Sequence, residues 1–288
     1  MEITVTAYTY PEVEKWVKSG ADSIRFGEPH CYLKALRDWD EKKIRKACAL
    51  IESSGKKAQL QLLVAPSSRE EIEYTRNLCN LASSNGIDLV LGSLGMLKIT
   101  NSCVAGSYIK AYNRLDLEVL SRHGVRIVSI SPDLAKEEIE GLIRNAPSML
   151  FEYQIHGPVS LMTSWKCFLR QMCPAEGKGN CSYVCTGYIR MHSLSGEELF
   201  DVNGNSLATS RDLCMLPHLG ELFDMGVSIG LIETRNREYD NCIIDVYKEA
   251  VQDPGNFEYL KRLRGNFLDG WYHGKEGNSF CLGRKVDE

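Results

Sequence analysis

The sequence lacks the short signatures that identify several large enzyme classes. It contains no HExxH zinc-peptidase helix, no GxSxG nucleophile turn, no P-loop and no GxGxxG dinucleotide-binding loop. It also lacks an uninterrupted apolar run of about eighteen residues, and its first stretch, "MEITVTAYTYPEVEKW", has no basic or apolar signal region. We therefore expect a cytoplasmic protein that does not span a membrane.

An excess of charge of one sign is missing as well. The formal net charge is −4 over 288 residues, and lysine and arginine are spread along the chain. Proteins that bind DNA usually gather basic residues on one face. We therefore expect no DNA partner, whereas the charge neither supports contact with RNA nor rules it out.

What the sequence does contain is a repeated αβ unit. The segments "SGADSIRFG", "NGIDLVLGS", "HGVRIVSIS" and "MGVSIGLIE" each place a glycine at the end of a helix and run directly into an apolar strand. We predict an α/β fold, a (β/α)8 TIM-barrel-like single domain over residues 1–288. Its eight strands are predicted near residues 2–7, 21–27, 57–65, 87–92, 103–110, 126–131, 149–156 and 227–233.

A cysteine-rich insertion, residues 157–226, separates the seventh and eighth predicted strands. It holds a hairpin candidate, "YIRMHSLSGEELFDVNGNSLATS", and a helix candidate, "RDLCMLPHLGELFDMG". Long loops are usually functional, and this one leaves the C-terminal face, where barrel active sites lie. Elsewhere, helix starts are predicted at Asp40 and at the Ser68 capping box "SREE".

Cysteine is abundant, with eleven residues, and four of them fall within "KCFLRQMCPAEGKGNCSYVC": Cys167, Cys173, Cys181 and Cys185. Structural disulfides are rare in a reducing compartment, so metal ligation is the leading use for this cluster. Only the last pair has zinc-knuckle spacing, and no CxxxCxxC triplet is present. Spacing alone leaves three alternatives: reduced structural cysteines, a zinc site or an iron–sulfur centre.

Two more cysteines are candidates to complete a four-thiolate site. Cys31 closes the turn "FGEPHC", which also carries Glu28, just beyond the second predicted strand. Cys214 lies in "SRDLC", inside the insertion. Both are plausible by position because the four ligands of an iron–sulfur cluster need not be contiguous in sequence.

Polar residues interrupt the last two predicted strands. In "LFEYQIHG", Glu152, Gln154 and His156 alternate with apolar residues, and period two places them on one face. In "GLIETR", Glu233 and Arg235 repeat the pattern. Because barrel interiors are normally apolar, these groups form either a buried structural ion pair or a polar substrate pocket. We take Glu152, His156, Glu233 and Arg235 as the candidate catalytic residues.

The motifs "GADSIRFG", "IHGPVSLMTSWKC", "NCSYVC", "ATSRDLCML" and "LIETR" together resemble the collagenase-like peptidase family U32, over essentially the whole chain. The resemblance implies a barrel-like fold with a cysteine-rich insertion that binds a 4Fe-4S cluster. It also implies a part in oxygen-independent hydroxylation of ubiquinone precursors, transfer RNA or ribosomal RNA. The peptidase label of the family is older, and the sequence shows no evident protease site.

The resemblance also implies a ligand set. Where many members carry the first ligand, this chain has Ser160, whereas Cys214 matches a ligand of the larger members. The smaller UbiV-like branch, which acts in anaerobic ubiquinone hydroxylation, has a cysteine in a "GExxC" turn. The cluster ligands expected from that branch are Cys31, Cys167, Cys181 and Cys185, with Cys214 as the reserve metal ligand.

The sequence therefore favours an iron–sulfur protein of oxygen-independent hydroxylation that acts on a small aromatic molecule or an RNA base. The alternatives are a peptidase or other hydrolase, and a non-catalytic subunit that carries the cluster. Because UbiV-like proteins act together with a longer family member, the resemblance also implies a heterodimer with a second member of the family.

Overall fold

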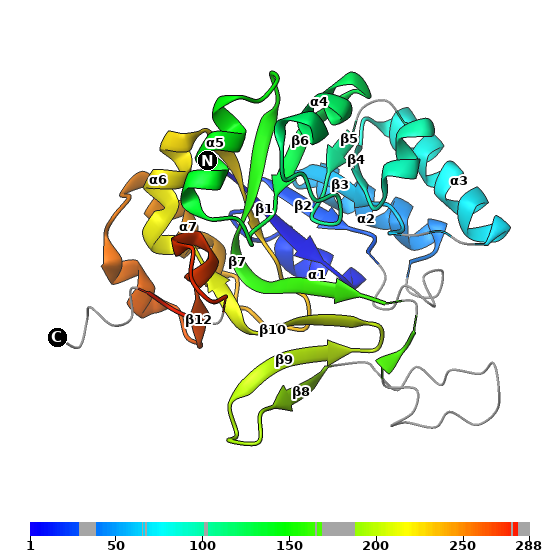
Figure 1. The fold of residues 1–288 in the computed structure, drawn as a ribbon. Coiled ribbons are helices and arrows are strands. Elements are labelled where there is room, and N and C mark those ends of the chain that lie inside the picture. The colour runs from blue at the N-terminus through cyan, green and yellow to red at the C-terminus, as the bar shows by residue number, and fades with distance from the viewer. Residues whose placement is uncertain are drawn as a thin grey trace.

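The computed structural model describes residues 1–28, 39–64, 66, 68–100, 103–164, 166–168, 188–277 and 279–281. Within these residues, eight parallel strands form a closed barrel with helices around it, which confirms the predicted TIM-barrel-like fold (Figure 1). Pairing of the last barrel strand with both its neighbours closes the ring. In barrel order the strands are β1 Glu2–Ala7, β2 Ser23–Phe26, β3 Lys57–Gln61, β4 Asp88–Leu91, β5 Cys103–Ala105, β6 Val125–Ile130, β7 Leu150–Thr163 and β11 Val227–Ile232.

The helices begin where the sequence predicts them. Asp40 accepts a hydrogen bond from the backbone N–H of Lys43, and Ser68 and Glu71 form the expected capping box. Gly86 and Gly226 end their helices in the left-handed conformation. The α-helices are α1 Tyr10–Trp16, α2 Glu41–Ser53, α3 Arg69–Asn85, α4 Arg114–Arg122, α5 Lys136–Arg144, α6 Leu219–Met225 and α7 Cys242–Gln252. Short 3-10 turns complete the chain: η2 Leu94–Lys98, η4 Leu216–His218, η5 Phe257–Arg262 and η6 Gly270–His273.

A second, antiparallel layer grows out of the barrel. β7 continues beyond the ring and pairs with β10 (Ser206–Cys214), which pairs with β9 (Glu198–Asn203) and through it with β8 (Ile189–His192) (Figure 1). The predicted hairpin is thereby confirmed. The predicted helix is wrong in its first part, because residues 211–214 continue β10 along the edge that β7 offers, and α6 begins only at Leu219.

An arginine after the last barrel strand forms ion pairs with the antiparallel layer. Arg237, in the loop after β11, contacts Asp201 of β9 at 2.8 Å and Asp212 of β10 at 2.8 Å. A further short strand, β12 (Phe267–Leu268), pairs in parallel with the end of β10. Arg237 and β12 therefore both hold the C-terminal end of β10.

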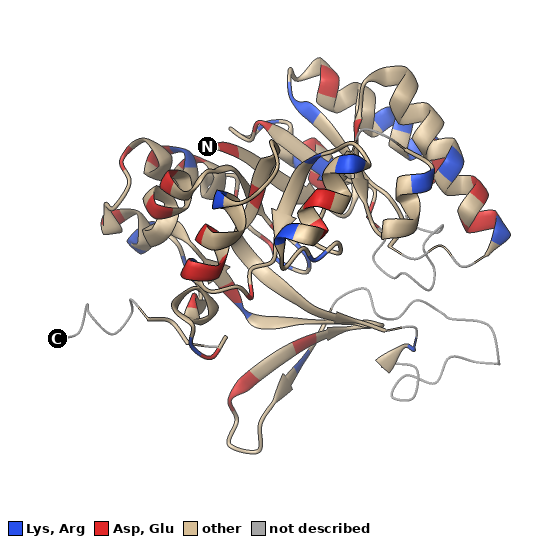
Figure 2. Cartoon of the chain, turned by 45° about the horizontal axis from the view of Figure 1, so that its top comes forward, with Lys and Arg blue, Asp and Glu red and all other residues tan. Residues whose placement is uncertain are grey.

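The surface carries both signs of charge. Figure 2 shows lysine and arginine mixed with aspartate and glutamate on the helices around the barrel. In the described part of the chain, every helix is too short or too polar to cross a bilayer.

The barrel interior is unusually polar. An apolar cluster of Val90, Val104, Ile127 and Ile229 fills part of it. Polar side chains fill the rest, because Arg25 of β2 reaches Glu152 of β7, and these strands are not neighbours in the ring. The contact therefore crosses the interior.

Candidate functional site

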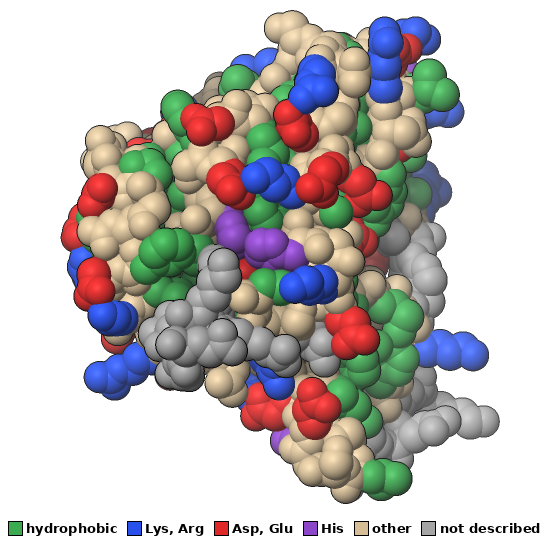
Figure 3. Space-filling model, turned by 60° about the vertical axis from the view of Figure 1, so that its left-hand side comes forward, with side chains coloured by type: hydrophobic (Ala, Val, Ile, Leu, Met, Phe, Trp, Pro, Cys, Tyr) green, Lys and Arg blue, Asp and Glu red, His purple; other side chains and the backbone are tan. Residues whose placement is uncertain are grey.

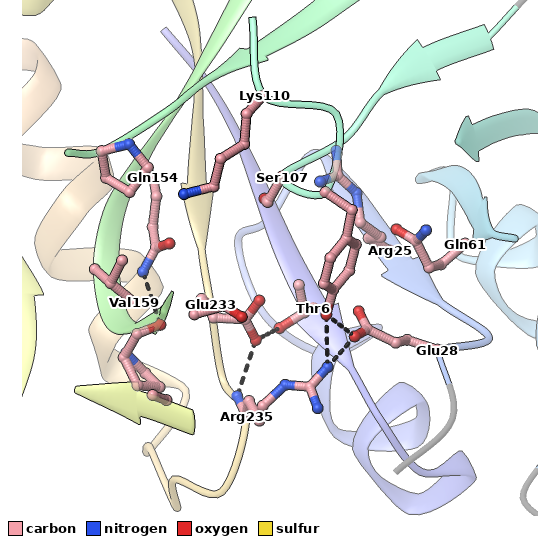
Figure 4. A pocket seen from close by; sticks show the side chains of 15 residues that line it. Thr6, Arg25, Glu28, Gln61, Ser107, Lys110, Gln154, Val159, Glu233 and Arg235 are labelled. Atoms are coloured by element: carbon pink, nitrogen blue, oxygen red, sulfur yellow. Dashed lines mark hydrogen bonds and ion pairs between the residues drawn. The ribbon is translucent and has the colours of Figure 1, made fainter. Parts of the chain in front are cut away.

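A pocket lies at the C-terminal mouth of the barrel, the face predicted from the sequence. Its cavity is small, about 30 Å³, and its walls come from strand ends or the loops that follow them (Figure 4). The lining residues are Thr6, Arg25, Glu28, Gln61, Ser107, Tyr108, Lys110, Pro132, Gln154, Pro158, Val159, Ser160, Ala208, Glu233 and Arg235. Most of its hydrogen-bonding groups belong to buried side chains.

The floor of the pocket is a buried ion pair. Arg25 donates to Glu152 Oε2 at 2.6 Å, and the two side chains are 4% and 0% exposed. The same guanidinium donates twice to Gln59 Oε1, at 3.0 and 2.8 Å, and Ser129 donates to the other carboxylate oxygen. Glu152 is thus where the sequence places it, inside the barrel, but Arg25 is its partner.

Arg235 stands on the wall of the pocket and pairs with Glu28. Its guanidinium donates to Glu28 and to the Tyr108 hydroxyl, the latter at 3.0 Å, and lies 4.6 Å from the centre of the Tyr8 ring. The sequence left a buried ion pair and a polar pocket open as alternatives, and the structure joins Arg235 to Glu28 in an ion pair on the pocket wall. The backbone N–H of Arg235 donates to Glu233 Oε1 at 2.9 Å.

Glu233 is half-buried beside hydroxyl groups. Tyr8 and Thr6 donate to its Oε1 at 2.7 and 3.0 Å. Burial raises the pKa of Glu233 above its usual range, although the hydrogen bonds from Tyr8, the Arg235 backbone and Thr6 oppose the shift. A carboxyl group with a raised pKa can hold and exchange a proton closer to neutral pH, which suits an acid–base role.

His156 does not join the pocket, and its expected position there is wrong. β7 carries one extra residue between Gln154 and His156, since these two face consecutive residues of β11. The bulge turns His156 away from the face of Glu152 and Gln154. Its Nδ1 lies 3.0 Å from the Tyr247 hydroxyl.

The surroundings of His156 are apolar and closed. The ring packs edge-on against Tyr239, Tyr247 and Phe267 and is 2% exposed. Burial lowers the pKa of His156 from 6.5 to about 4. The imidazole is therefore neutral under ordinary conditions, as expected of a packing residue.

Lowering the pH should destabilise the fold, because His156 is buried in its neutral form. Unfolded His156 takes a proton as the pH falls through about 6.5, whereas the folded residue resists until about 4. The free energy of unfolding is therefore unaffected by this group above pH 6.5, and it falls by about 3 kcal/mol between pH 6.5 and pH 4. Urea unfolding of the wild type and of His156→Phe over this range measures the effect. Equal pH slopes in the two proteins would contradict the assignment.

Gly157 allows β7 and the segment after β11 to approach closely. Its φ is +102°, and a Cβ here would lie 1.9 Å from the carbonyl oxygen of Glu233. The backbone carbonyl of the preceding residue, His156, accepts a hydrogen bond from the backbone N–H of Glu233 at 2.9 Å. The position of the Glu233 carboxylate thus depends on the absence of a side chain at residue 157.

Gly157→Ala should therefore destabilise the fold more than a matched substitution elsewhere. Gly196, at φ +86° in the β8–β9 turn, has nothing within 4 Å of an added Cβ. Gly196→Ala should cost about 1–2 kcal/mol, the left-handed strain alone. Gly157→Ala should cost about 2–5 kcal/mol, because steric overlap adds about 1–3 kcal/mol. Chemical denaturation compares the two, and equal costs would show that the close approach is not a constraint.

The structure places two of the candidate cysteine ligands and separates them. Cys167 is half-buried and packs against Val202, beside the β9–β10 turn. Cys214 is fully buried at the other end of β10, with its sulfur 3.6 Å from the Tyr247 hydroxyl. β10 residues rise about 3.3 Å each, so the two positions lie roughly 20 Å apart, too far to bind one cluster. Cys31, Cys173, Cys181 and Cys185 fall outside the described residues.

Cys214 also lacks the character of a reactive thiol. Burial raises its pKa to about 11, so the thiolate is scarce. Its cross-strand neighbour is His156, but both groups are neutral in an apolar setting. A cysteine–histidine nucleophile would need the opposite environment.

Sequence reasoning missed several lining residues. Arg25 is a charged residue in the apolar strand "SIRF", and Gln61 shares a period-two face of "KAQLQ" with Gln59, the partner of Arg25, so alternation carries the signal for both lining residues. Tyr108 and Lys110 lie in loops and leave no such signal. Their place in the pocket follows only from the closure of the barrel.

A polar pocket at the C-terminal mouth of a (β/α)8 barrel defines the class of the protein, and comparison with known proteins gives its family. The model of peptidase family U32 matches residues 9–278, so the chain belongs to this family. A solved U32 peptidase structure shares the fold, with a TM-score of 0.50 and 11% identity over 83% of this chain and 94% of that one.

Three proteins with known names have sequences related to this chain. A collagenase of Porphyromonas gingivalis is 24% identical over 95% of this chain and 74% of its own length. The tRNA hydroxylation protein P of Escherichia coli is 19% identical over 88% of this chain and 70% of its own length. An uncharacterized protease of Methanocaldococcus jannaschii is 23% identical over 74% of this chain and 51% of its own length.

Proposed function

We propose that this chain takes part in oxygen-independent hydroxylation of a quinone precursor or an RNA base, using a 4Fe-4S cluster. The observation that carries the proposal is the pocket itself, which is rich in buried hydrogen-bonding and ionic groups and has neither histidine nor cysteine among its described lining residues. Such a lining suits a planar polar substrate better than a peptide bond. The relative named for tRNA hydroxylation supports the same reaction class.

Two of the proposed ligands are close to pocket elements, one in sequence and one in the structure. Cys31 follows Glu28 by three residues, and Glu28 lines the pocket. Cys167 is half-buried near the β9–β10 turn, a few residues along β10 from the lining residue Ala208. Thiolates are the ligands of such clusters, and Cys181 and Cys185 complete the proposed set. The distance along β10 argues against Cys214 as a fifth candidate.

A bound cluster of this kind supplies electrons one at a time. The protein's own groups hold the substrate: Arg235 and Tyr108 offer donors, and the ammonium group of Lys110, 39% exposed, reaches in from the side opposite Arg235 (Figure 4). Glu233 is placed to accept or return a proton at its carboxylate. The Arg25–Glu152 pair below keeps the floor ordered.

A peptidase mechanism finds less support. Ser107 and Ser160 line the pocket, but no described histidine lies there to activate either hydroxyl. Cys214 and His156 are sealed in the apolar cluster around Tyr247. The collagenase name of one relative is therefore not matched by a nucleophile and base in the described residues.

The proposal includes a heterodimer with a second family member. The outer hairpin exposes apolar side chains that a protein partner would cover, among them Ile189, Met191 and Phe200. Co-expression with a family member from the same genome should yield a stable pair. A monomer with full activity would remove this part of the proposal.

The experiment that tests the function follows the product. Cells lacking the chain are grown without oxygen, and their quinones and RNA nucleosides are compared with those of the parent by mass spectrometry. One hydroxylated species should disappear, return with the wild-type gene, and stay absent with Cys167→Ala. Unchanged quinones and nucleosides would contradict the proposal.

A further inference from the structure

A cluster of two histidines and an aspartate lies outside the set of residues that line the pocket. His218 ends η4, Asp269 precedes η6, and His273 ends η6. One carboxylate oxygen, Asp269 Oδ2, lies 3.2 Å from His218 Nε2 and 3.4 Å from His273 Nε2. All three ligand atoms are within 4.8 Å of one another. We propose that these residues bind a divalent transition-metal ion, for which zinc is the best match.

The donor spacing supports a metal. Two ligands bound to zinc at about 2.0–2.1 Å in a tetrahedron lie about 3.3 Å apart. Both measured separations from Asp269 Oδ2 fall within 0.1 Å of that edge. Two imidazoles and one carboxylate form a zinc ligand set in which the fourth position is left for water. His273 is 31% exposed, so water can reach that position.

Neighbouring groups orient two of the three ligands, Asp269 and His218. The second oxygen of Asp269 accepts the backbone N–H of Cys281 at 2.7 Å, which leaves Oδ2 for the ion. The Tyr272 ring packs on His218 at 4.6 Å between centres, and its hydroxyl donates to Glu221 Oε2 at 2.8 Å. That same Glu221 oxygen lies 3.7 Å from His218 Nδ1.

The tautomer of His218 separates a metal site from a plain hydrogen-bond cluster. If neutral His218 donated from Nε2 to Asp269, its Nδ1 lone pair would face the Glu221 carboxylate, which is also an acceptor. A metal on Nε2 removes this conflict, since Nδ1 then carries the proton and points it at Glu221. A carboxylate behind a ligating histidine is the usual arrangement at zinc sites. A doubly protonated His218 is the competing solution.

The ion would fasten the C-terminal segment to the barrel. His218 lies between β10 and α6, whereas Asp269 and His273 belong to the segment that contributes β12 to the edge of β10. Figure 3 shows histidine side chains side by side at the surface of this face, and the rings of His218 and His273 are 5.0 Å apart. The proposed ion would bridge the two segments, and none of its three ligands lines the pocket.

Zinc itself is the probe in the test. Full-length protein, purified without oxygen with its iron in place, is stripped with a chelator, supplied with zinc and passed through a desalting column. Zinc and iron are then measured in the same sample. The wild type should retain one more zinc per chain than His273→Ala, with equal iron, and zinc should raise the melting temperature of the wild type only.

Matched variants keep the test decisive. His192→Ala removes an exposed histidine of the outer hairpin and should retain the zinc. Glu221→Gln should weaken zinc binding about 10–100-fold, the usual effect of losing a carboxylate behind a ligand. His273→Ala is chosen over changes at buried Asp269 because it should fold, as circular dichroism can verify. Repeating the retention assay with Fe(II) in place of zinc distinguishes the two metals, because two histidines and one carboxylate also bind Fe(II). Equal metal in wild type and His273→Ala would overturn the site and leave a protonated hydrogen-bond cluster.

Discussion

Arg25→Met should lower the free energy of unfolding by about 3–5 kcal/mol, among the largest effects of any single change in this chain. The reason is that Glu152, 0% exposed, would lose the cation that compensates its charge. Replacing both partners, in Arg25→Met with Glu152→Leu, should recover most of the loss because no charge is then left buried. Urea denaturation followed by circular dichroism measures all three proteins.

A surface pair is the control for this comparison. Lys57 and Glu2 lie 2.9 Å apart, but their side chains are 60% and 50% exposed. Lys57→Met should therefore change the free energy of unfolding by at most about 1 kcal/mol. If Arg25→Met proved as mild as Lys57→Met, the ion pair would not be the organising contact of the barrel interior.

The second large effect concerns activity. Arg235→Met combined with Glu28→Leu removes both partners of the pair on the pocket wall, so the protein should fold and keep its iron. It should nevertheless form no hydroxylated product, because Arg235 and Glu28 both line the space that the substrate would occupy. The measurement is product in anaerobic cells, with iron per chain determined alongside.

The single variant Arg235→Met separates stability from function. On its own it leaves Glu28 with a buried charge, so its melting temperature should fall below that of the double variant. Product formation by the stable double variant would show that the Arg235–Glu28 pair is scaffolding, and would leave Glu233 and Lys110 as the groups that act on substrate.

Local sequence patterns predicted the barrel but not its interior. Glycine-to-strand junctions such as "NGIDLVLGS" encode the αβ repeat in neighbouring residues, and every predicted strand is present. The placement of Glu152 and Glu233 follows from the same period-two rule. The partner of Glu152 does not, because Arg25 lies 127 residues earlier in the chain and meets it only when the ring closes.

Two errors share one physical origin. His156 leaves the pocket face because a single extra residue in β7 reverses the alternation that period two assumes. Residues 211–214 form strand instead of helix because the extension of β7 provides an antiparallel edge, and edge pairing outweighs local preference. Both depend on register between segments far apart in the sequence, which a local pattern does not contain.

The most direct test of the central claim is the iron and acid-labile sulfide content of protein purified without oxygen. The wild type should be coloured and hold about four irons per chain, as a 4Fe-4S cluster implies. Cys167→Ala should lose the iron, whereas Cys214→Ala should keep it, because Cys214 lies roughly 20 Å along β10 from the proposed ligand site. A colourless wild type, or a Cys214→Ala protein that loses iron while Cys167→Ala retains it, would contradict the account.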